Sequence, residues 1–228
     1  LAPKDALCGT HIAVRVCSAG FPTAIFSALM CVSTIVLNLI LVAYGNAPVA
    51  AIGIVFKANM FITFLQMGLA NGVQPIFGYS YGAGDIKRFA DTERFTKLCC
   101  FVVGLAATAL YFFLRKPIIG LFVDGGSVFT LTWDGLKLFS PVFLFIGLNV
   151  FLSGYFTALG NGFISALISS LRSLILVVAF ILILPKLLGV SGVWITMPLA
   201  EAVTIFIAVY LYRTYGKSFM QENSRAMS

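Results

Sequence analysis

Residues 16–56 read VCSAGFPTAIFSALMCVSTIVLNLILVAYGNAPVAAIGIVF and contain no charged side chain. The 41 residues are too many for one membrane span, which takes about 20 residues, but enough for most of two. The segment Gly45-Asn46-Ala47-Pro48 supplies a break, because glycine and proline favour turns. We therefore expect one helix over residues 21–44, with Pro22 in its first turn, and a second over residues 49–75.

The composition of the whole chain agrees with a membrane protein. Of its 228 residues, 60% are hydrophobic and 10% are charged, whereas an average soluble domain has about 25% charged residues. So few charges cannot coat the surface that a soluble domain of this size exposes to water. The composition excludes an ordinary soluble enzyme, a disordered tail and a coiled coil, and it indicates an all-α, polytopic membrane helix bundle.

Charged and turn residues divide the remaining chain into four more apolar segments. The expected spans are residues 98–114, 138–159, 163–184 and 190–212, which brings the total to six transmembrane helices in one domain over residues 1–228. We expect a glycine-rich turn over 78–84, a charged loop over 85–97 and an interfacial turn over 117–123. Pro185 is expected to end the fifth helix. The chain begins with Leu1 rather than Met, and we expect it to be part of a longer protein.

The basic residues are distributed unequally between the two sides of this predicted bundle. One side carries Lys4, Arg15, Lys87, Arg88, Arg94, Lys97, Arg213, Lys217 and Arg225, and the other carries Arg115, Lys116, Lys137 and Lys186. Cytoplasmic loops of membrane proteins are enriched in lysine and arginine. We therefore expect both termini in the cytoplasm and interpret the net charge of +7 as membrane topology, not as a signal for nucleic-acid binding.

The sequence offers little for metal or catalytic chemistry. It has a single histidine, His11, and its five cysteines show neither a CxxC pair nor a metal-ligand spacing. HExxH, GxSxG and carboxylate pairs at helical spacing are absent. We expect neither an enzyme nor a bound metal or organic cofactor.

Polar side chains inside the apolar segments mark candidate functional positions, because hydrocarbon penalises them. The first and fourth predicted helices carry polar stripes at spacings of three and four residues, and the second carries polar groups on two opposite sides. The candidates for lining a cleft are Asn38, Lys57, Asn59, Phe64, Gln66 and Asn149. The alternative for each stripe is helix–helix packing, which also uses small and hydroxyl residues.

Three ionisable residues are expected inside the membrane. Lys57 either extends outward to the membrane surface or lies in a cavity, where it would pair with an acidic group elsewhere. Arg172 and Glu201 lie on the two arms of a predicted hairpin around Gly189, and helix rise separates their depths by about 7–8 Å. A structural ion pair is the leading interpretation. A role for Glu201 in ion coupling is the alternative.

The segment Gly72-Val73-Gln74-Pro75-Ile76-Phe77-Gly78-Tyr79-Ser80-Tyr81-Gly82-Ala83 resembles the G-x-Q-P-[IL]-x-G-[YF]-[NS]-[YF]-G-A motif of the multidrug and toxic compound extrusion (MATE) family. Further along, Pro198-Leu199-Ala200-Glu201 is similar to the "P-l-A-E" segment of the same family. The resemblance covers residues 20–215. It implies a V-shaped, twelve-helix transporter of two six-helix lobes, of which this chain would be the C-terminal one.

The resemblance also implies a function. Family members are secondary antiporters that export cationic lipophilic compounds against inward H⁺ or Na⁺, through a cleft that the first two helices of this lobe would line. The implied partner is an N-terminal six-helix lobe, and the implied location is the cell membrane. Some members bind the coupling cation with an acidic residue in each of two helices whose stripes here show Asn38 and Asn149. Either the ion site lies in the N-terminal lobe, which we expect, or the coupling is lost.

Two other transport functions remain as alternatives. A lipid-linked oligosaccharide flippase of the same superfamily needs a strongly cationic cleft for a diphosphate, and only Lys57 and Arg172 are available here. The membrane domain of an ATP-driven exporter would need a GxxxxGK[ST] motif, which is absent from this chain but could reside on a separate one.

Overall fold

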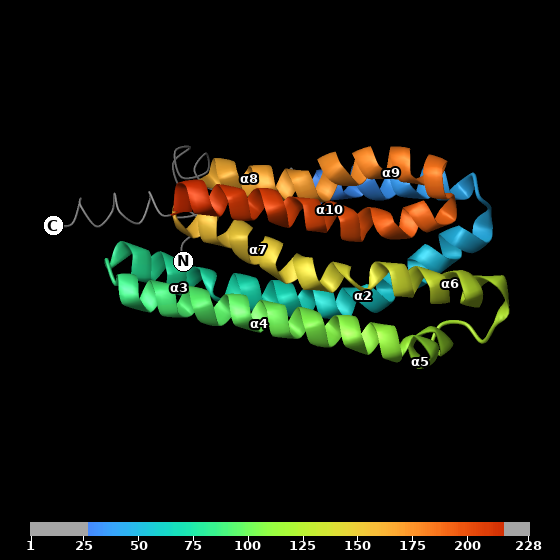
Figure 1. Ribbon diagram of the computed structural model, residues 1–228, viewed down its shortest axis with the longest axis horizontal. Coiled ribbons are helices and arrows are strands. Elements are labelled where there is room, and N and C mark those ends of the chain that lie inside the picture. Colours follow the sequence, from blue (N-terminus) through green and yellow to red (C-terminus); the bar gives the residue numbers. More distant parts are fainter. Residues whose placement is uncertain (1–26, 217–228) are drawn as a thin grey trace, which may run out of the picture.

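The computed structural model describes residues 27–216, and every regular element in that range is helical (Figure 1). The helices run side by side along the long axis of the molecule. They are Ser27–Val42, α2 (Asn46–Gly72), α3 (Gln74–Gly82), α4 (Ile86–Phe113), α5 (Arg115–Gly120), α6 (Gly126–Phe139), α7 (Val142–Ala158), α8 (Gly162–Ser170), the π-helix η1 (Leu171–Ile175), α9 (Leu176–Leu188), α10 (Val190–Leu211) and the π-helix η2 (Tyr212–Gly216). This architecture confirms the predicted all-α membrane helix bundle.

Four continuous helical segments, some of which join two or three of these helices, are long and apolar enough to cross a membrane: Asn46–Gly82, Ile86–Phe113, Gly162–Leu188 and Val190–Gly216. The pair α6–α7 makes a fifth candidate span that bends by 50° at the break between its two helices. The first expected span, 21–44, is represented by the shorter apolar helix Ser27–Val42. Residues 21–26 of that span lie outside the described residues.

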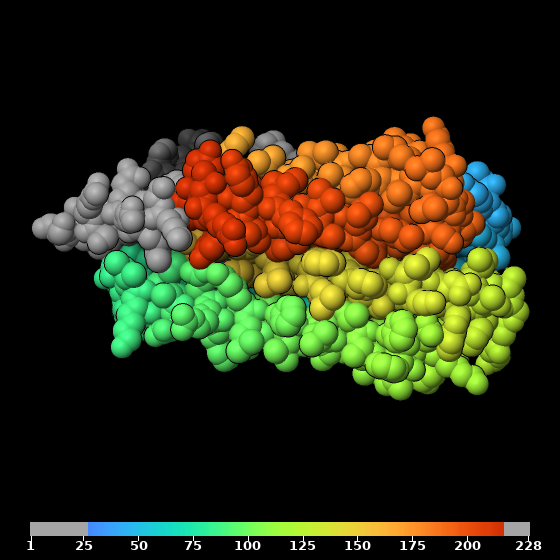
Figure 2. All heavy atoms as spheres, in the orientation of Figure 1, coloured from blue at the N-terminus to red at the C-terminus, as the bar shows by residue number. Residues whose placement is uncertain are grey.

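Helix α7 forms the centre of the bundle. It packs against α2, α4, α8 and α10, and its side chains Phe143, Phe151 and Phe156 are almost fully buried. Figure 2 shows α7 only as a band between the layer of α9 and α10 and the layer of α4. Because its neighbours bury α7 on several sides, this helix supplies the core against which the other helices pack.

Three segments that we expected to be turns or loops are wholly or partly helical, and one of them, 117–123, begins inside α5. The second expected span does not end at Pro75, because α3 continues the direction of α2 to Gly82. Pro75 lies in the first turn of α3, where the missing N–H costs little. The charged segment 85–97 is the start of α4. Its N-cap is Asp85, whose carboxylate accepts a hydrogen bond of 3.0 Å from the backbone N–H of Arg88.

The expected ends of two later helices are also wrong. The fourth span does not begin at residue 138, because residues 126–139 already form α6 and a bend at Ser140–Pro141 joins it to α7. Pro185 lies inside α9 and does not end it. Gly189 ends the helix instead, because its φ of 59° is a left-handed conformation that glycine adopts without strain.

The close packing of α4 on α7 leads to a testable prediction. A Cβ at Gly104 would overlap the carbonyl oxygen of Phe143, whereas a Cβ at Gly53 on α2 would meet no atom within 4 Å. Gly104→Ala should therefore lower the free energy of unfolding by about 1–3 kcal/mol. Gly53→Ala, the matched control, should leave it unchanged or raise it by up to about 1 kcal/mol. Thermal unfolding in detergent measures both, and equal stabilities would contradict this packing.

Candidate functional site

Arg172 and Glu201 form an ion pair inside the lobe. The guanidinium of Arg172 donates from Nε and Nη2 to Oε1 of Glu201, at 3.1 and 2.8 Å. The two side chains are 13% and 8% exposed. The charges therefore sit in a low-dielectric interior, where a pair is favourable only with good geometry and further hydrogen bonds.

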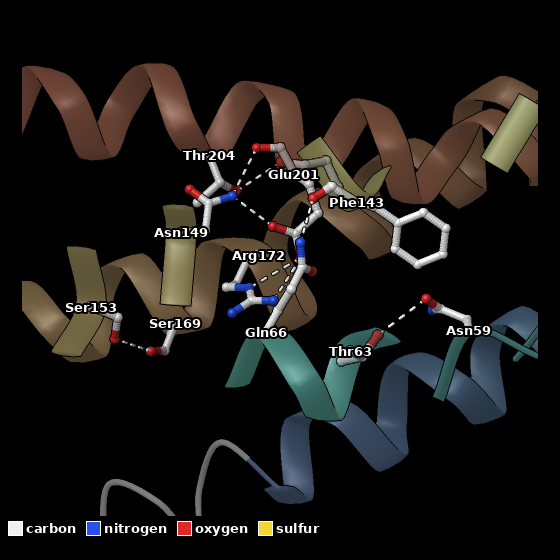
Figure 3. Close-up of polar contacts among 11 residues, drawn as sticks. Asn59, Thr63, Gln66, Phe143, Asn149, Ser153, Ser169, Arg172, Glu201 and Thr204 are labelled. Atoms are coloured by element: carbon white, nitrogen blue, oxygen red, sulfur yellow. Dashed lines mark hydrogen bonds and ion pairs between the residues drawn. The ribbon is translucent and has the colours of Figure 1, made fainter. Parts of the chain in front are cut away.

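Asn149 on α7 completes the surroundings of the Glu201 carboxylate. Its Nδ2 donates to Oε2 of Glu201 at 2.6 Å and to the backbone carbonyl of the same residue at 2.9 Å. Figure 3 shows Asn149 and Arg172 approaching Glu201 from different helices. Both carboxylate oxygens are thus hydrogen-bonded, which offsets part of the cost of removing the charge from water.

Two local features of the backbone place the pair. The α9–α10 hairpin turns at Gly189 and brings Gly192 so close to Leu184 that a Cβ would overlap the Leu184 carbonyl. Arg172 lies in the π-helix η1, which interrupts the α8–α9 rod. Such bulges shift the helical register by one residue and are frequent at functional sites.

The helix Ser27–Val42 is hydrogen-bonded to the segment that directly follows Arg172. Ser33 donates from its hydroxyl to the backbone carbonyl of Ser173 at 2.6 Å, and Ser173 directly follows Arg172 in η1. Ser33 is 2% exposed. This helix is therefore hydrogen-bonded to the segment that carries the arginine of the ion pair.

The structure corrects the expectation for two of the six residues that we expected to line a cleft. Gln66 is fully buried, and its Nε2 donates to the Phe143 carbonyl at 2.7 Å. Asn149 is also fully buried, on Glu201. Both fill the interior of the lobe, because the sides of α2 and α7 that carry them face each other and α10.

The other four expected cleft residues are fully or partly exposed. Lys57 is exposed and Phe64 is 58% exposed on α2. Asn59 is half-buried and accepts a hydrogen bond of 3.1 Å from Thr63. Asn38 is half-buried and donates to the backbone carbonyl of Thr34 at 3.0 Å. These residues stay candidates for a surface that faces a cleft.

A second buried charge was not singled out from the sequence. Glu93 on α4 is 7% exposed, accepts a hydrogen bond from the hydroxyl of Tyr212 and pairs with Lys97. The cluster joins α4 to the end of the α10 rod. The spacing of four residues between Glu93 and Lys97 was the available signal, but it lay in a segment expected to be a loop.

The geometry of the ion pair predicts an asymmetry between two variants. Glu201→Gln leaves a buried arginine, which keeps its charge, and should cost about 3–5 kcal/mol of stability. Arg172→Gln should cost less, because the carboxyl keeps Asn149 as a donor and can take up a proton. The double variant should recover part of the loss. Thermal stability in detergent tests this, and strictly additive losses would show that the two residues do not interact.

The chain is similar to known transporters in both sequence and structure. The MatE family model matches residues 22–183. The multidrug export protein MepA of Staphylococcus saprophyticus is 27% identical over 206 residues, which cover 89% of this chain and 45% of that protein. MepA of Staphylococcus aureus strain NCTC 8325 is 28% identical over 197 residues, which cover 85% and 43%.

Two solved structures show the same fold at low sequence identity. An outward-facing multidrug resistance MATE family transporter of the MOP superfamily matches with a TM-score of 0.84 and 18% identity, over 94% of this chain and 49% of its own. A MOP superfamily transporter from Pyrococcus furiosus matches with a TM-score of 0.85 and 17% identity, over 96% and 50%.

The present chain spans about half the length of the curated relatives it matches. The described helices correspondingly form one lobe of such a structure. Because the family model covers most of the chain and the fold agrees with it, this chain belongs to the MatE (multidrug and toxic compound extrusion) family of membrane transporters.

Proposed function

We propose that this chain is the C-terminal lobe of a secondary antiporter that exports cationic lipophilic compounds in exchange for inward H⁺ or Na⁺. The lobe would form its transport cleft with a second six-helix lobe. Transport of this kind changes no covalent bond, so the proposal assigns neither an enzymatic reaction nor a cofactor to this chain.

The observation that carries the proposal is the exposed face of α2. Phe61 is 79% exposed, Phe64 is 58% exposed and Met60 is 53% exposed, and Lys57 and Asn71 are exposed on the same helix. A charged and an amide side chain on this face would be unfavourable in contact with lipid tails. Aromatic rings attract organic cations, and methionine adapts to apolar groups of different shapes. The face therefore suits a cleft for lipophilic cations.

The location that we propose is the cell membrane, with both termini in the cytoplasm. The support is the excess of lysine and arginine at one end of the bundle, including Lys87, Arg88 and Arg94 near the start of α4 and Arg213 in η2. Four other residues of this count, Lys4, Arg15, Lys217 and Arg225, lie outside the described residues.

The ion pair bears on the flippase alternative. A cleft for a lipid diphosphate requires several free cationic side chains, and Arg172 is engaged by Glu201. Of the two intramembrane basic residues, only Lys57 remains exposed in this lobe. This favours a cationic over a phosphorylated substrate.

The proposal predicts that the lobe does not transport alone, because a secondary transporter of this type moves two repeats around a shared site. Proteoliposomes with this chain by itself should show no gradient-driven export of a fluorescent lipophilic cation. Proteoliposomes with both lobes should export it. Sustained export by the single lobe would contradict the proposal.

A second prediction concerns Lys57. If Lys57 faces the cleft and pairs with an acidic group across it, Lys57→Ala in the complete transporter should lower the export rate by about 5–150-fold, the range of typical coupling energies. Its melting temperature should stay near that of the parent. Lys186→Ala, which removes an exposed lysine at the end of α9, is the matched control and should export normally. Normal export by Lys57→Ala would assign Lys57 to the membrane surface.

A further inference from the structure

Arg115 lies between aromatic side chains where α4 meets α5 and α6. Its guanidinium carbon Cζ is 4.2 Å from the ring centroid of Trp133 on α6 and 4.9 Å from that of Phe112 on α4. Aromatic rings attract a cation through their faces, but they leave the N–H donors of the guanidinium without an oxygen acceptor. The rings therefore hold Arg115 in place without neutralising its charge.

The guanidinium of Arg115 has an enclosed side and an open side. The residue is half-buried, and Nη1 is its one nitrogen that is buried without a hydrogen-bond partner. Nε and Nη2 form no hydrogen bond or ion pair within residues 27–216 either, so these two donors are the ones at the surface. Arg172 uses the same two nitrogens to hold the carboxylate of Glu201. Arg115 presents an equivalent pair that no acidic side chain of the described chain occupies.

The aromatic support of Arg115 is rigid. Trp133 stacks on Phe129, one turn earlier in α6, with ring centroids 6.3 Å apart and an interplanar angle of 18°. Gly135 lies on the other side of α6, where a Cβ would overlap the ring of Trp194 on α10. Helix α6 is thus packed against the bundle while Trp133 holds the guanidinium. A group held in this way loses little freedom when it binds a ligand.

The charges near Arg115 favour an anionic ligand. Lys116 follows it in α5, and Lys137 lies one turn after Trp133 on the same side of α6; both lysines are exposed. The acidic residues of this region are exposed and form no ion pair within the described part of the chain: Asp124 and Asp134. Asp134 lies about 100° around α6 from Trp133 and is therefore directed away from the guanidinium.

The position of Arg115 corresponds to the level of the lipid head groups. It follows the apolar span Ile86–Phe113 by two residues, and tryptophan is enriched at this level of membrane proteins. Figure 1 shows α5 and α6 at the end of the bundle opposite the α3–α4 turn. Lysine and arginine are expected to be scarce at this end, so membrane topology does not account for Arg115 and Lys116.

Exposed apolar side chains adjoin Arg115 in the chain. Phe113 and Leu114 precede it, and Leu121 follows α5. An acyl chain that covers such a surface removes apolar area from water, which is favourable, whereas inorganic phosphate has no apolar part to bury there. The free guanidinium and the apolar surface together match a phospholipid, which carries a phosphate and acyl chains in one molecule.

We propose that Arg115 binds the phosphate group of an anionic phospholipid at this end of the lobe. Nε and Nη2 donate to two phosphate oxygens in the bidentate geometry that arginine forms with phosphate, and Lys116 and Lys137 add positive charge. The site shares no residue with the exposed face of α2. The inference therefore goes beyond the proposed export and does not depend on it.

Native mass spectrometry of the complete transporter in detergent measures this binding. Phosphatidylglycerol, which is anionic, should bind more tightly than phosphatidylcholine, which has the same phosphodiester but no net charge. Arg115→Gln should lower the affinity for the most tightly bound phosphatidylglycerol by about tenfold or more, because a charge-assisted pair of hydrogen bonds is lost. Lys186→Gln is the matched control, since it removes an exposed lysine at the same end of the bundle, and it should keep the parent's affinity.

Two further variants separate this site from a general effect of positive charge. Arg115→Lys keeps the charge but lacks the planar fork, and should bind phosphatidylglycerol about threefold or more weakly than the parent. Trp133→Leu removes a ring from the guanidinium and should also weaken binding. Thermal unfolding without added lipid checks that each variant is folded. The preference for phosphatidylglycerol over phosphatidylcholine is measured on the unmodified protein and needs no variant.

Inorganic phosphate distinguishes the two sources of the phosphate group. An excess of it should not displace phosphatidylglycerol, and displacement would overturn the lipid as the ligand. Equal affinities of the parent for the two lipids would overturn the preference for an anionic head group. Parent affinity in Arg115→Gln would overturn the site, and parent affinity in Arg115→Lys would overturn the bidentate contact.

Discussion

The Glu201 carboxylate lies in the interior of an apolar helix bundle, where an unpaired charge would be strongly unfavourable. Three donors from two other elements surround it: Nε and Nη2 of Arg172 from η1, and Nδ2 of Asn149 from α7. This requirement constrains the backbone. The α9–α10 hairpin must be close enough for the arginine to reach α10, which Gly192 permits, and the α8–α9 rod contains the π-helix at the arginine. The relative positions of these elements are therefore linked through one carboxylate.

The depth of this pair was predictable from the sequence, because helix rise is nearly constant and a short hairpin sets the counting origin at Gly189. The environments of Gln66 and Asn149 were not. Periodicity shows which residues share one side of a helix, but the neighbours of that side follow from tertiary packing, and several helices here carry polar groups on more than one side. The role of Asn149 required knowing that α7 packs against α10.

The predicted helix boundaries were wrong for a different reason. We treated charged residues as loop residues, yet a transmembrane helix continues past the hydrocarbon into the headgroup region, where charges on its surface are solvated. Asp85 marked the true start of α4 as an N-cap with its hydrogen bond to the Arg88 N–H. Proline was a similarly weak signal for the end of a helix. Pro185 is buried inside α9, and the helix ends only at Gly189, where a positive φ lets the chain turn.

Two groups of polar residues in the lobe have different surroundings. Inside the lobe, Arg172 and Asn149 both bond to Glu201, whereas Lys57 and Asn71 are exposed on the face of α2 that also carries exposed phenylalanines. The helix Ser27–Val42 precedes α2 in the chain and is bonded through Ser33 to the segment after Arg172. Helix α7 joins the two groups directly, because Asn149 on α7 bonds to Glu201, and Gln66 on α2 donates to the α7 carbonyl of Phe143.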